Sequence, residues 1–231
     1  MNLSKPYYQD ESVTLYHGDA REILSQLEFT SFDMVLTDPP YPSLRKWEGI
    51  GTTARMGMGR KGSGADDASK FFETITYQDM PRLFSEFYRV LRPNCHALVM
   101  SDDVSLPYIF QVLGQGWQCP EGCQWWPQED LEFGLWSNWK LLVWDKMVLG
   151  MGYHFRSQHE YVVLLDKGKN RPPAHLNLGD VLRFTPDKKL VPTQKPIALF
   201  ELLISELTET GATILDPFAG SGTALRAAKN L

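Results

Sequence analysis

The sequence is poor in cysteine and contains no long apolar run. Its 231 residues include three cysteines, Cys95, Cys119 and Cys123, which are too few for a disulfide framework. Cys119 and Cys123 lack a convincing second pair of metal ligands, so no metal site is predicted. No apolar stretch approaches the roughly 20 residues that cross a bilayer, and the N-terminus lacks the apolar region of a signal peptide. We therefore expect a cytoplasmic protein.

An excess of basic charge is also lacking. The net charge of −5 argues against a general nucleic-acid coat protein, although it permits a local basic groove. Hydrophobic content of 43% and charged content of 22% are typical of a globular protein. The length predicts one large domain over residues 1–231.

Short apolar runs alternate with amphipathic stretches along the chain. Strands are predicted at 13–17, 32–38, 96–102, 140–146, 160–168 and 212–217. A first helix is predicted after residue 17, with Ile23, Leu24 and Leu27 on one face. Further helices are predicted at 78–93, 106–114, 194–208 and 223–231. Pro93 is expected to stop the helix at 78–93, and Gly211 to mark the end of the helix at 194–208. This alternation predicts an α/β fold with a mixed, mostly parallel sheet and helices on both faces.

Two segments interrupt the alternation. In the loop at 45–64, five basic residues outnumber the single acid, Glu48: Arg45, Lys46, Arg55, Arg60 and Lys61. A loop of this length within a compact domain is usually functional or disordered. The stretch 118–139 holds four of the seven tryptophans and is interpreted as an aromatic-rich insertion, with core or interface packing favoured over base stacking.

The stretch "TDPPYP" follows the apolar run Met34–Leu36. Its two prolines forbid continuation of a strand ladder, so the backbone must leave the sheet in a stiff, extended form. Asp38 and Tyr41 are then held at the carboxyl end of a strand, where open α/β sheets bind ligands. A rigid turn with a solvated Asp38 is the plainer alternative.

The stretch "LDPFAGSGTALRAA" predicts a strand ending at Asp216, a turn of small residues and a helix from about Thr223. Glycines let a backbone approach a ligand closely, and a helix N-terminus presents free N–H groups. The spacing is neither that of the dinucleotide fingerprint nor that of a P-loop. A close strand-to-helix turn without a ligand is the alternative.

Together, "DPFAGSGT" and "DPPY" resemble the amino-methyltransferases of DNA, and their order along the chain resembles the β-class arrangement. "LYHGDAREIL", "HEYVVLLDKG" and "PTQKPIALFELLI" are also similar to that family, so the resemblance covers nearly the whole chain. It implies a single catalytic domain with a Rossmann-like S-adenosylmethionine-dependent methyltransferase fold. It further implies S-adenosylmethionine as cofactor, double-stranded DNA as partner and a restriction-modification context, and it is compatible with a homodimer.

The resemblance assigns roles residue by residue. The catalytic tetrapeptide is Asp38, Pro39, Pro40 and Tyr41, with Asp38 also counted among the cofactor-binding residues. The other cofactor-binding residues are Asp19 near the adenine, Thr193 and Lys195 at the methionine end, and Asp216, Phe218, Gly220, Gly222 and Thr223 in the wrapping motif. Arg45, Lys46, Arg55, Arg60 and Lys61 are expected to contact DNA phosphates beside the extruded base.

The tetrapeptide begins with Asp rather than Ser, which favours adenine N6 over cytosine N4 as the methylated amine. The order of the motifs along the chain argues against an RNA or protein-glutamine methyltransferase, and so does Asp rather than Asn at position 38. In the family the fold continues past the last helix into a strand whose acid binds the cofactor ribose, whereas this sequence ends at Leu231. Asp10 and Glu11 are candidates to replace that ribose-binding acid. The alternative from another functional class is a DNA-binding protein with impaired catalysis.

Overall fold

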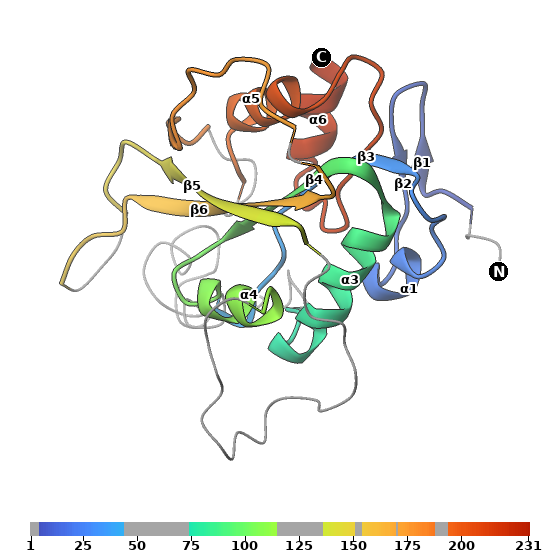
Figure 1. The fold of residues 1–231 in the computed structure, drawn as a ribbon, viewed down its shortest axis with the longest axis horizontal. Coiled ribbons are helices and arrows are strands. Elements are labelled where there is room, and N and C mark those ends of the chain that lie inside the picture. The colour runs from blue at the N-terminus through green and yellow to red at the C-terminus, as the bar shows by residue number, and fades with distance from the viewer. Residues whose placement is uncertain (1–4, 44–73, 115–135, 151–153, 170, 188–193) are drawn as a thin grey trace, which may run out of the picture.

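The computed structural model describes residues 5–43, 74–114, 136–150, 154–169, 171–187 and 194–231 (Figure 1). The predicted DNA-contacting residues Arg45, Lys46, Arg55, Arg60 and Lys61, the cofactor residue Thr193, and most of the aromatic stretch 118–139 lie outside these ranges. Within the ranges, no helix combines the length and apolarity needed to cross a membrane.

A six-stranded sheet forms the centre of the described structure, in the order β7-β5-β6-β4-β3-β8. Its strands are β3 (Phe32–Thr37), β4 (Leu91–Ser101), β5 (Asn138–Asp145), β6 (His159–Lys167), β7 (Val181–Arg183) and β8 (Ile214–Leu215). β6 pairs antiparallel with both of its neighbours, and the other three pairings are parallel. The predicted mixed, mostly parallel sheet is confirmed.

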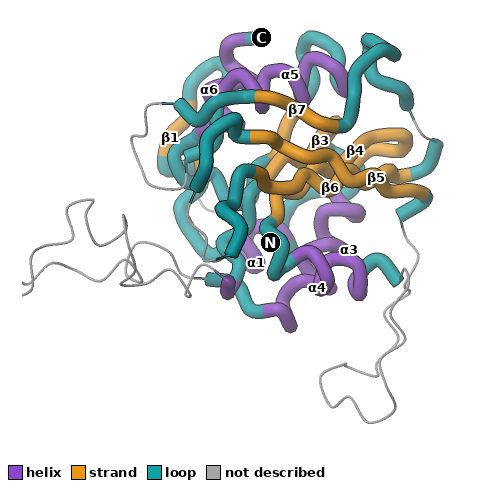
Figure 2. The backbone as a smooth tube through the Cα atoms, turned by 90° about the vertical axis from the view of Figure 1, so that its left-hand side faces the viewer, coloured by secondary structure: helices purple, strands orange, loops and turns teal. Residues whose placement is uncertain are grey.

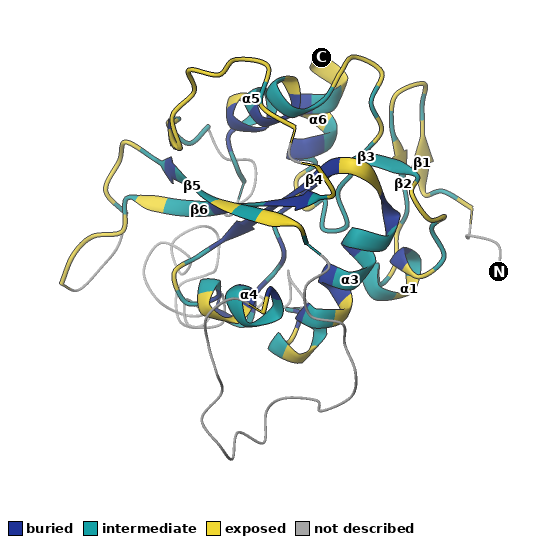
Figure 3. Cartoon of the chain, in the orientation of Figure 1, coloured by how far each residue is buried: buried dark blue, intermediate teal, exposed yellow. Residues whose placement is uncertain are grey.

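Helices cover both faces of this sheet, as Figure 2 shows. One layer contains α1 (Ala20–Leu24), α3 (Met80–Val90), which follows the 3-10 turn η3 (Tyr77–Asp79), and α4 (Leu106–Val112); the other contains α5 (Ile197–Leu207) and α6 (Thr223–Asn230). Side chains of a strand alternate between the faces. Val35 packs with the first layer, whereas Met34 and Leu36 pack with the second. The sheet therefore separates two apolar clusters, and β4 is buried over most of its length (Figure 3).

Several local predictions differ from the structure, among them the strand predicted at 212–217, of which only β8 forms. The strand predicted at 13–17 is only β2 (Thr14–Leu15), which pairs with β1 (Tyr8–Gln9) in a separate hairpin because the short segment finds its partner locally. α5 ends at Leu207, and Gly211, with φ of 87°, lies in the turn beyond it. Pro93 lies inside β4 rather than after a helix, at an irregularity in the β3–β4 register that accommodates its missing N–H.

Candidate active site

The carboxyl ends of β3, β4 and β8 meet at one edge of the sheet, where a cavity of about 1900 Å³ opens. Ligands of open α/β sheets bind at this edge. The cavity is lined by many of the predicted site residues: Asp38, Pro39, Pro40, Tyr41, Lys195, Asp216, Phe218, Gly220 and Thr223. Because β6 runs antiparallel, its amino end reaches the same edge and adds His159 and Glu160 to the lining.

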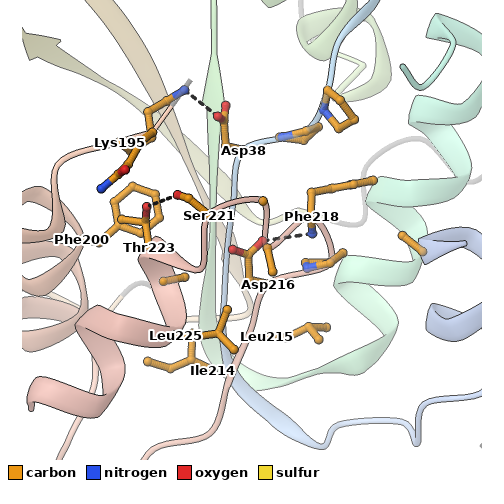
Figure 4. A pocket seen from close by; sticks show the side chains of 18 of the residues that line it. Asp38, Lys195, Phe200, Ile214, Leu215, Asp216, Phe218, Ser221, Thr223 and Leu225 are labelled. Carbon is orange, nitrogen blue, oxygen red and sulfur yellow. Dashed lines mark hydrogen bonds and ion pairs between the residues drawn. The ribbon is translucent and has the colours of Figure 1, made fainter. Parts of the chain in front are cut away.

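Asp216 is tied directly to the strand that carries the tetrapeptide. The Thr37 hydroxyl donates to Asp216 Oδ1 over 2.7 Å. The Phe218 N–H donates to the same oxygen over 3.0 Å (Figure 4). Burial raises the pKa of Asp216 to about 7, although these two hydrogen bonds oppose the shift. The two motifs, 179 residues apart in the chain, are thereby held together at the cavity.

Asp38 forms an ion pair with Lys195. The distance from Lys195 Nζ to Asp38 Oδ2 is 2.5 Å, and the two side chains are 11% and 32% exposed respectively. Burial raises the pKa of Asp38 above its ordinary value, while the charge of Lys195 opposes that shift. Burial alone lowers the pKa of Lys195, but the carboxylates of Asp38 and Glu160 outweigh it, so its pKa is raised. Burial and the Lys195 charge thus act on the pKa of Asp38 in opposite directions, and burial is the larger effect.

The backbone of the tetrapeptide is fixed by short hydrogen bonds. The Pro39 carbonyl accepts the Tyr41 N–H over 2.9 Å, and the Pro40 carbonyl accepts the Ile75 N–H over 3.0 Å. Each carbonyl keeps a second lone pair. The tyrosine ring is 3% exposed and packs in the apolar cluster beneath the cavity, and its hydroxyl has no hydrogen-bond partner among the described residues. In this structure Tyr41 thus offers little surface on which a base could stack.

The chain leaving the tetrapeptide is anchored by a carboxylate that sequence reasoning missed. Ser43 donates to Asp102 Oδ2 over 2.5 Å, and Asp102 Oδ1 accepts the Ser105 N–H over 2.7 Å. Asp102 follows the end of β4, which pairs with β3. Three polar residues, "SDD", directly after an apolar strand were the available sequence signal.

The turn before α6 depends on two glycines in the left-handed region. Gly220 has φ of 49° and Gly222 has φ of 78°, a conformation that L side chains rarely adopt. A Cβ on Gly220 would meet the Phe218 carbonyl at 3.7 Å, an ordinary contact, so conformation rather than crowding selects glycine here. Gly222 caps α6 without a side-chain hydrogen bond, which leaves helix N–H groups for a ligand.

These groups fit S-adenosylmethionine, which carries an anionic carboxylate and cationic centres. Free N–H groups at a helix N-terminus suit the carboxylate, and the carboxyls of Asp38 and Asp216 suit the cations. The residues that would hold the cofactor are Lys195, Asp216, Phe218, Gly220 and Thr223, together with Asp38.

Asp19 lies outside this arrangement. It is the N-cap of α1, its Oδ1 accepts the Arg21 N–H over 2.8 Å, and its carboxylate pairs with the Arg21 guanidinium at 2.6 Å. It is not among the described residues that line the cavity, although Gly18 and Ala20 are. Asp10, considered as a ribose ligand, accepts hydrogen bonds from the Ser12 and Val13 N–H groups and from Lys229. Both carboxylates thus have local structural partners.

An α/β sheet with one reversed strand, a cavity at the carboxyl edge and two motifs joined across it define the Rossmann-like methyltransferase class. The chain belongs to the DNA methylase family of N6/N4 methyltransferases, whose model matches residues 32–231.

Individual proteins agree with this assignment. The type II methyltransferase M2.DpnII of Streptococcus pneumoniae is 27% identical over 241 residues, covering 99% of this chain and 85% of that protein. Two solved structures share the fold. The M1.HpyAVI–SAM complex matches with a TM-score of 0.57 at 22% identity, covering 93% of this chain and 87% of that one. The cytosine-N4-specific PvuII DNA methyltransferase matches with a TM-score of 0.61 at 17% identity, covering 98% and 81%.

Asp216→Asn is expected to raise the melting temperature at about pH 8. The native carboxyl, with a pKa of about 7, keeps a proton that the unfolded chain has lost above its ordinary 3.8. Stability therefore falls as the pH rises between these values and stays lowered above them. The amide has no such cost, so the two proteins should converge near about pH 4. Thermal melts of both proteins across this range test the shift, and an Asn variant that melts below the parent at high pH would contradict it.

Proposed function

We propose that this DNA methyltransferase transfers a methyl group from S-adenosylmethionine to the exocyclic N6 amine of adenine in double-stranded DNA. The observation that carries the proposal is Asp38 at the cavity, with Oδ2 held by Lys195 and the Pro39 carbonyl one residue further along the chain. The Asp at the start of the tetrapeptide favours adenine over cytosine. The similarity in fold to a cytosine-N4-specific enzyme supports the second candidate, N4 methylation of cytosine.

The amine needs two hydrogen-bond acceptors because its lone pair is delocalised into the base. Asp38 Oδ1 and the Pro39 carbonyl accept its two hydrogens and favour a pyramidal nitrogen whose lone pair can attack. The prolines and the ion pair with Lys195 hold these acceptors with little reorganisation, which is the effective form of electrostatic catalysis.

S-adenosylmethionine, when bound, supplies a methyl carbon on a sulfonium, which calls for in-line positioning more than for a strong base. As the nitrogen–carbon bond forms and the carbon–sulfur bond breaks, the amine becomes cationic and loses a proton. Asp38 accepts that proton and passes it to solvent. Its raised pKa suits this late role better than early removal of a proton from a neutral amine.

The target base must leave the duplex to reach the sheet edge. The phosphate contacts predicted for Arg45, Lys46, Arg55, Arg60 and Lys61 remain predictions from composition and from their position after Tyr41. The homodimer and the cytoplasmic location remain predictions as well.

The decisive experiment is identification of the methylated nucleoside. We expect the protein, incubated with duplex DNA and methyl-labelled S-adenosylmethionine, to yield labelled N6-methyl-2′-deoxyadenosine after digestion to nucleosides and mass spectrometry. N4-methyl-2′-deoxycytidine would select the second candidate. DNA binding without any labelled nucleoside would instead favour a DNA-binding protein that has lost turnover. RNA and total protein are tested in parallel as alternative methyl acceptors.

A further inference from the structure

Four charged side chains of alternating sign lie in a row that ends at Asp38. Lys146 Nζ lies 2.7 Å from Glu160 Oε1, and Glu160 Oε2 lies 3.3 Å from Lys195 Nζ. Lys195 in turn lies 2.5 Å from Asp38 Oδ2. The order of the four side chains is therefore Lys146, Glu160, Lys195 and Asp38, with charges that alternate in sign. Glu160 contacts two lysines, and Lys195 contacts two carboxylates.

The sheet explains why these residues meet. Glu160 is the second residue of β6, whose amino end reaches the cavity edge because this strand is reversed. β5 pairs Trp144 with Glu160, so Lys146, two residues after Trp144, emerges beside the same carboxylate. Lys195 comes from the segment before α5. Four separate parts of the chain thus converge on one line.

The row is too shielded to be an ordinary surface ion pair. The side chains of Lys195, Lys146 and Glu160 are 11%, 19% and 26% exposed. Exposed pairs contribute little because solvent screens them, whereas partly buried charges interact more strongly and depend on their partners. Burial alone would raise the pKa of Glu160, but its two lysines outweigh that effect and lower it, so the group stays ionised.

We propose that Glu160 and Lys146 are positioning residues for the methyl transfer, which hold Lys195 on Oδ2 of Asp38 so that Oδ1 remains available to the amine. Within the described residues, the hydrogen bond that Asp38 accepts is the one from Lys195 to Oδ2. The inference rests on the proposed function, because the amine is its substrate. Neither Glu160 nor Lys146 needs to touch that substrate.

An alternating row makes a prediction about sign. Glu160 is a negative charge near Asp38 and disfavours its ionised form, whereas Lys146 is positive and balances Glu160. If Glu160 acted only as a nearby charge, its removal would lower the pKa of Asp38. If Glu160 holds Lys195 on Asp38, its removal releases that cation and raises the pKa of Asp38, and removal of the Lys146 charge raises it as well. Among the described residues, the other acidic groups facing Asp38 are Asp102 after β4 and Asp216 after β8, and both variants leave them unchanged.

The test uses the full-length variants Glu160→Gln and Lys146→Gln, which keep side-chain shape and remove one charge each. Carboxyl-carbon NMR of aspartate-labelled protein, with Asp38→Asn to assign the signal, follows the titration of Asp38 without cofactor or DNA. We expect the midpoint to move up in Glu160→Gln by about one pH unit, because Lys195 is no longer held on Asp38. In Lys146→Gln it should move up by a smaller amount.

A matched control removes a lysine from the same region. Lys140 lies on β5 in an exposed pair with Asp180 at 3.0 Å and does not line the cavity in the described structure. Lys140→Gln should leave the titration of Asp38 unchanged. A downward shift in Glu160→Gln, or no shift, would overturn the proposal, because a nearby charge that does not hold Lys195 gives the first and a merely structural role gives the second. If Glu160→Gln fails to fold, Glu160→Asp, which keeps the charge on a shorter side chain, should still raise the midpoint.

The pH dependence of turnover gives the second readout. The acid limb of the kcat/KM profile, which reports the free enzyme, should shift in the same direction as the NMR midpoint in both variants. At saturating cofactor and DNA the rate should be lower, with an unchanged KM for DNA. An inactive parent protein would refute the proposed function, while the NMR titration would still test the row of charges. If the parent protein is active but neither variant shifts the titration of Asp38, the positioning role of Glu160 and Lys146 is refuted and the proposed function is not.

Discussion

Replacing Asp38 by alanine is expected to lower the rate of methyl transfer by at least about a hundredfold, the range seen when a positioned electrostatic group is lost. In the proposed mechanism, the substitution removes one of two acceptors of the amine hydrogens and the group that takes up the proton. It also leaves Lys195, 11% exposed, with Glu160 as its remaining carboxylate partner at this end of the row. Single-turnover transfer of labelled methyl to duplex DNA measures the effect.

Asp38→Asn is the matched comparison. The amide keeps an acceptor oxygen but no longer takes up a proton or pairs with the Lys195 charge, so its rate should lie between those of the parent and the alanine variant. DNA affinity should change far less than the rate in both variants, because the duplex is bound mainly through its phosphates. Near-parental turnover in Asp38→Ala would refute the acceptor role.

Replacing Gly220 by leucine is expected to abolish binding of S-adenosylmethionine while the protein remains folded. Gly220 lines the cavity beside Phe218 and Ser221, and its φ of 49° resists any side chain. The conformational cost is about 1–2 kcal/mol, too little to unfold a typical domain. The larger effect comes from a branched side chain filling space that the ligand needs. Isothermal titration calorimetry with the cofactor measures the loss.

Gly114→Leu is the control for backbone strain. Gly114 also has a positive φ, 67°, at the end of α4, but it is exposed and does not line the cavity in the described part of the chain. It should lose a similar amount of stability and keep cofactor binding. Unchanged binding in Gly220→Leu would remove the glycine turn from the proposed cofactor site.

Local patterns were sufficient to predict the main strands and the edge where the site lies. The run Met34–Leu36 is fully buried in β3, and the two prolines after it end the strand as their missing N–H groups require. The apolar period of α3 places Leu83, Phe84 and Phe87 in the core. Each of these features depends on residues only a few positions apart in the chain, so it can be predicted from the local sequence pattern.

The charge row could not be predicted in the same way. Nothing near Glu160 in the sequence says that β6 is reversed, and this reversal alone brings its amino end to the cavity. Lys146 and Lys195 become its neighbours only through pairing of distant segments. Conversely, the resemblance gave Asp19 a ligand role, whereas the local geometry of α1 uses its carboxylate as a cap. A sequence motif alone does not distinguish a carboxylate that caps a helix from one that binds a ligand.

The strand that carries the cofactor motif is the one with the least backbone support. β8 pairs with β3 through only two residues, Ile214 and Leu215, at one end of the described sheet, whereas β4 is paired on both sides along most of its length. Local opening of β8 therefore costs less free energy than opening of the sheet centre. A ligand that spans Asp216 and Asp38 adds the cross-link that the ladder itself does not provide. Binding of such a ligand should therefore stabilise this edge of the sheet against local opening.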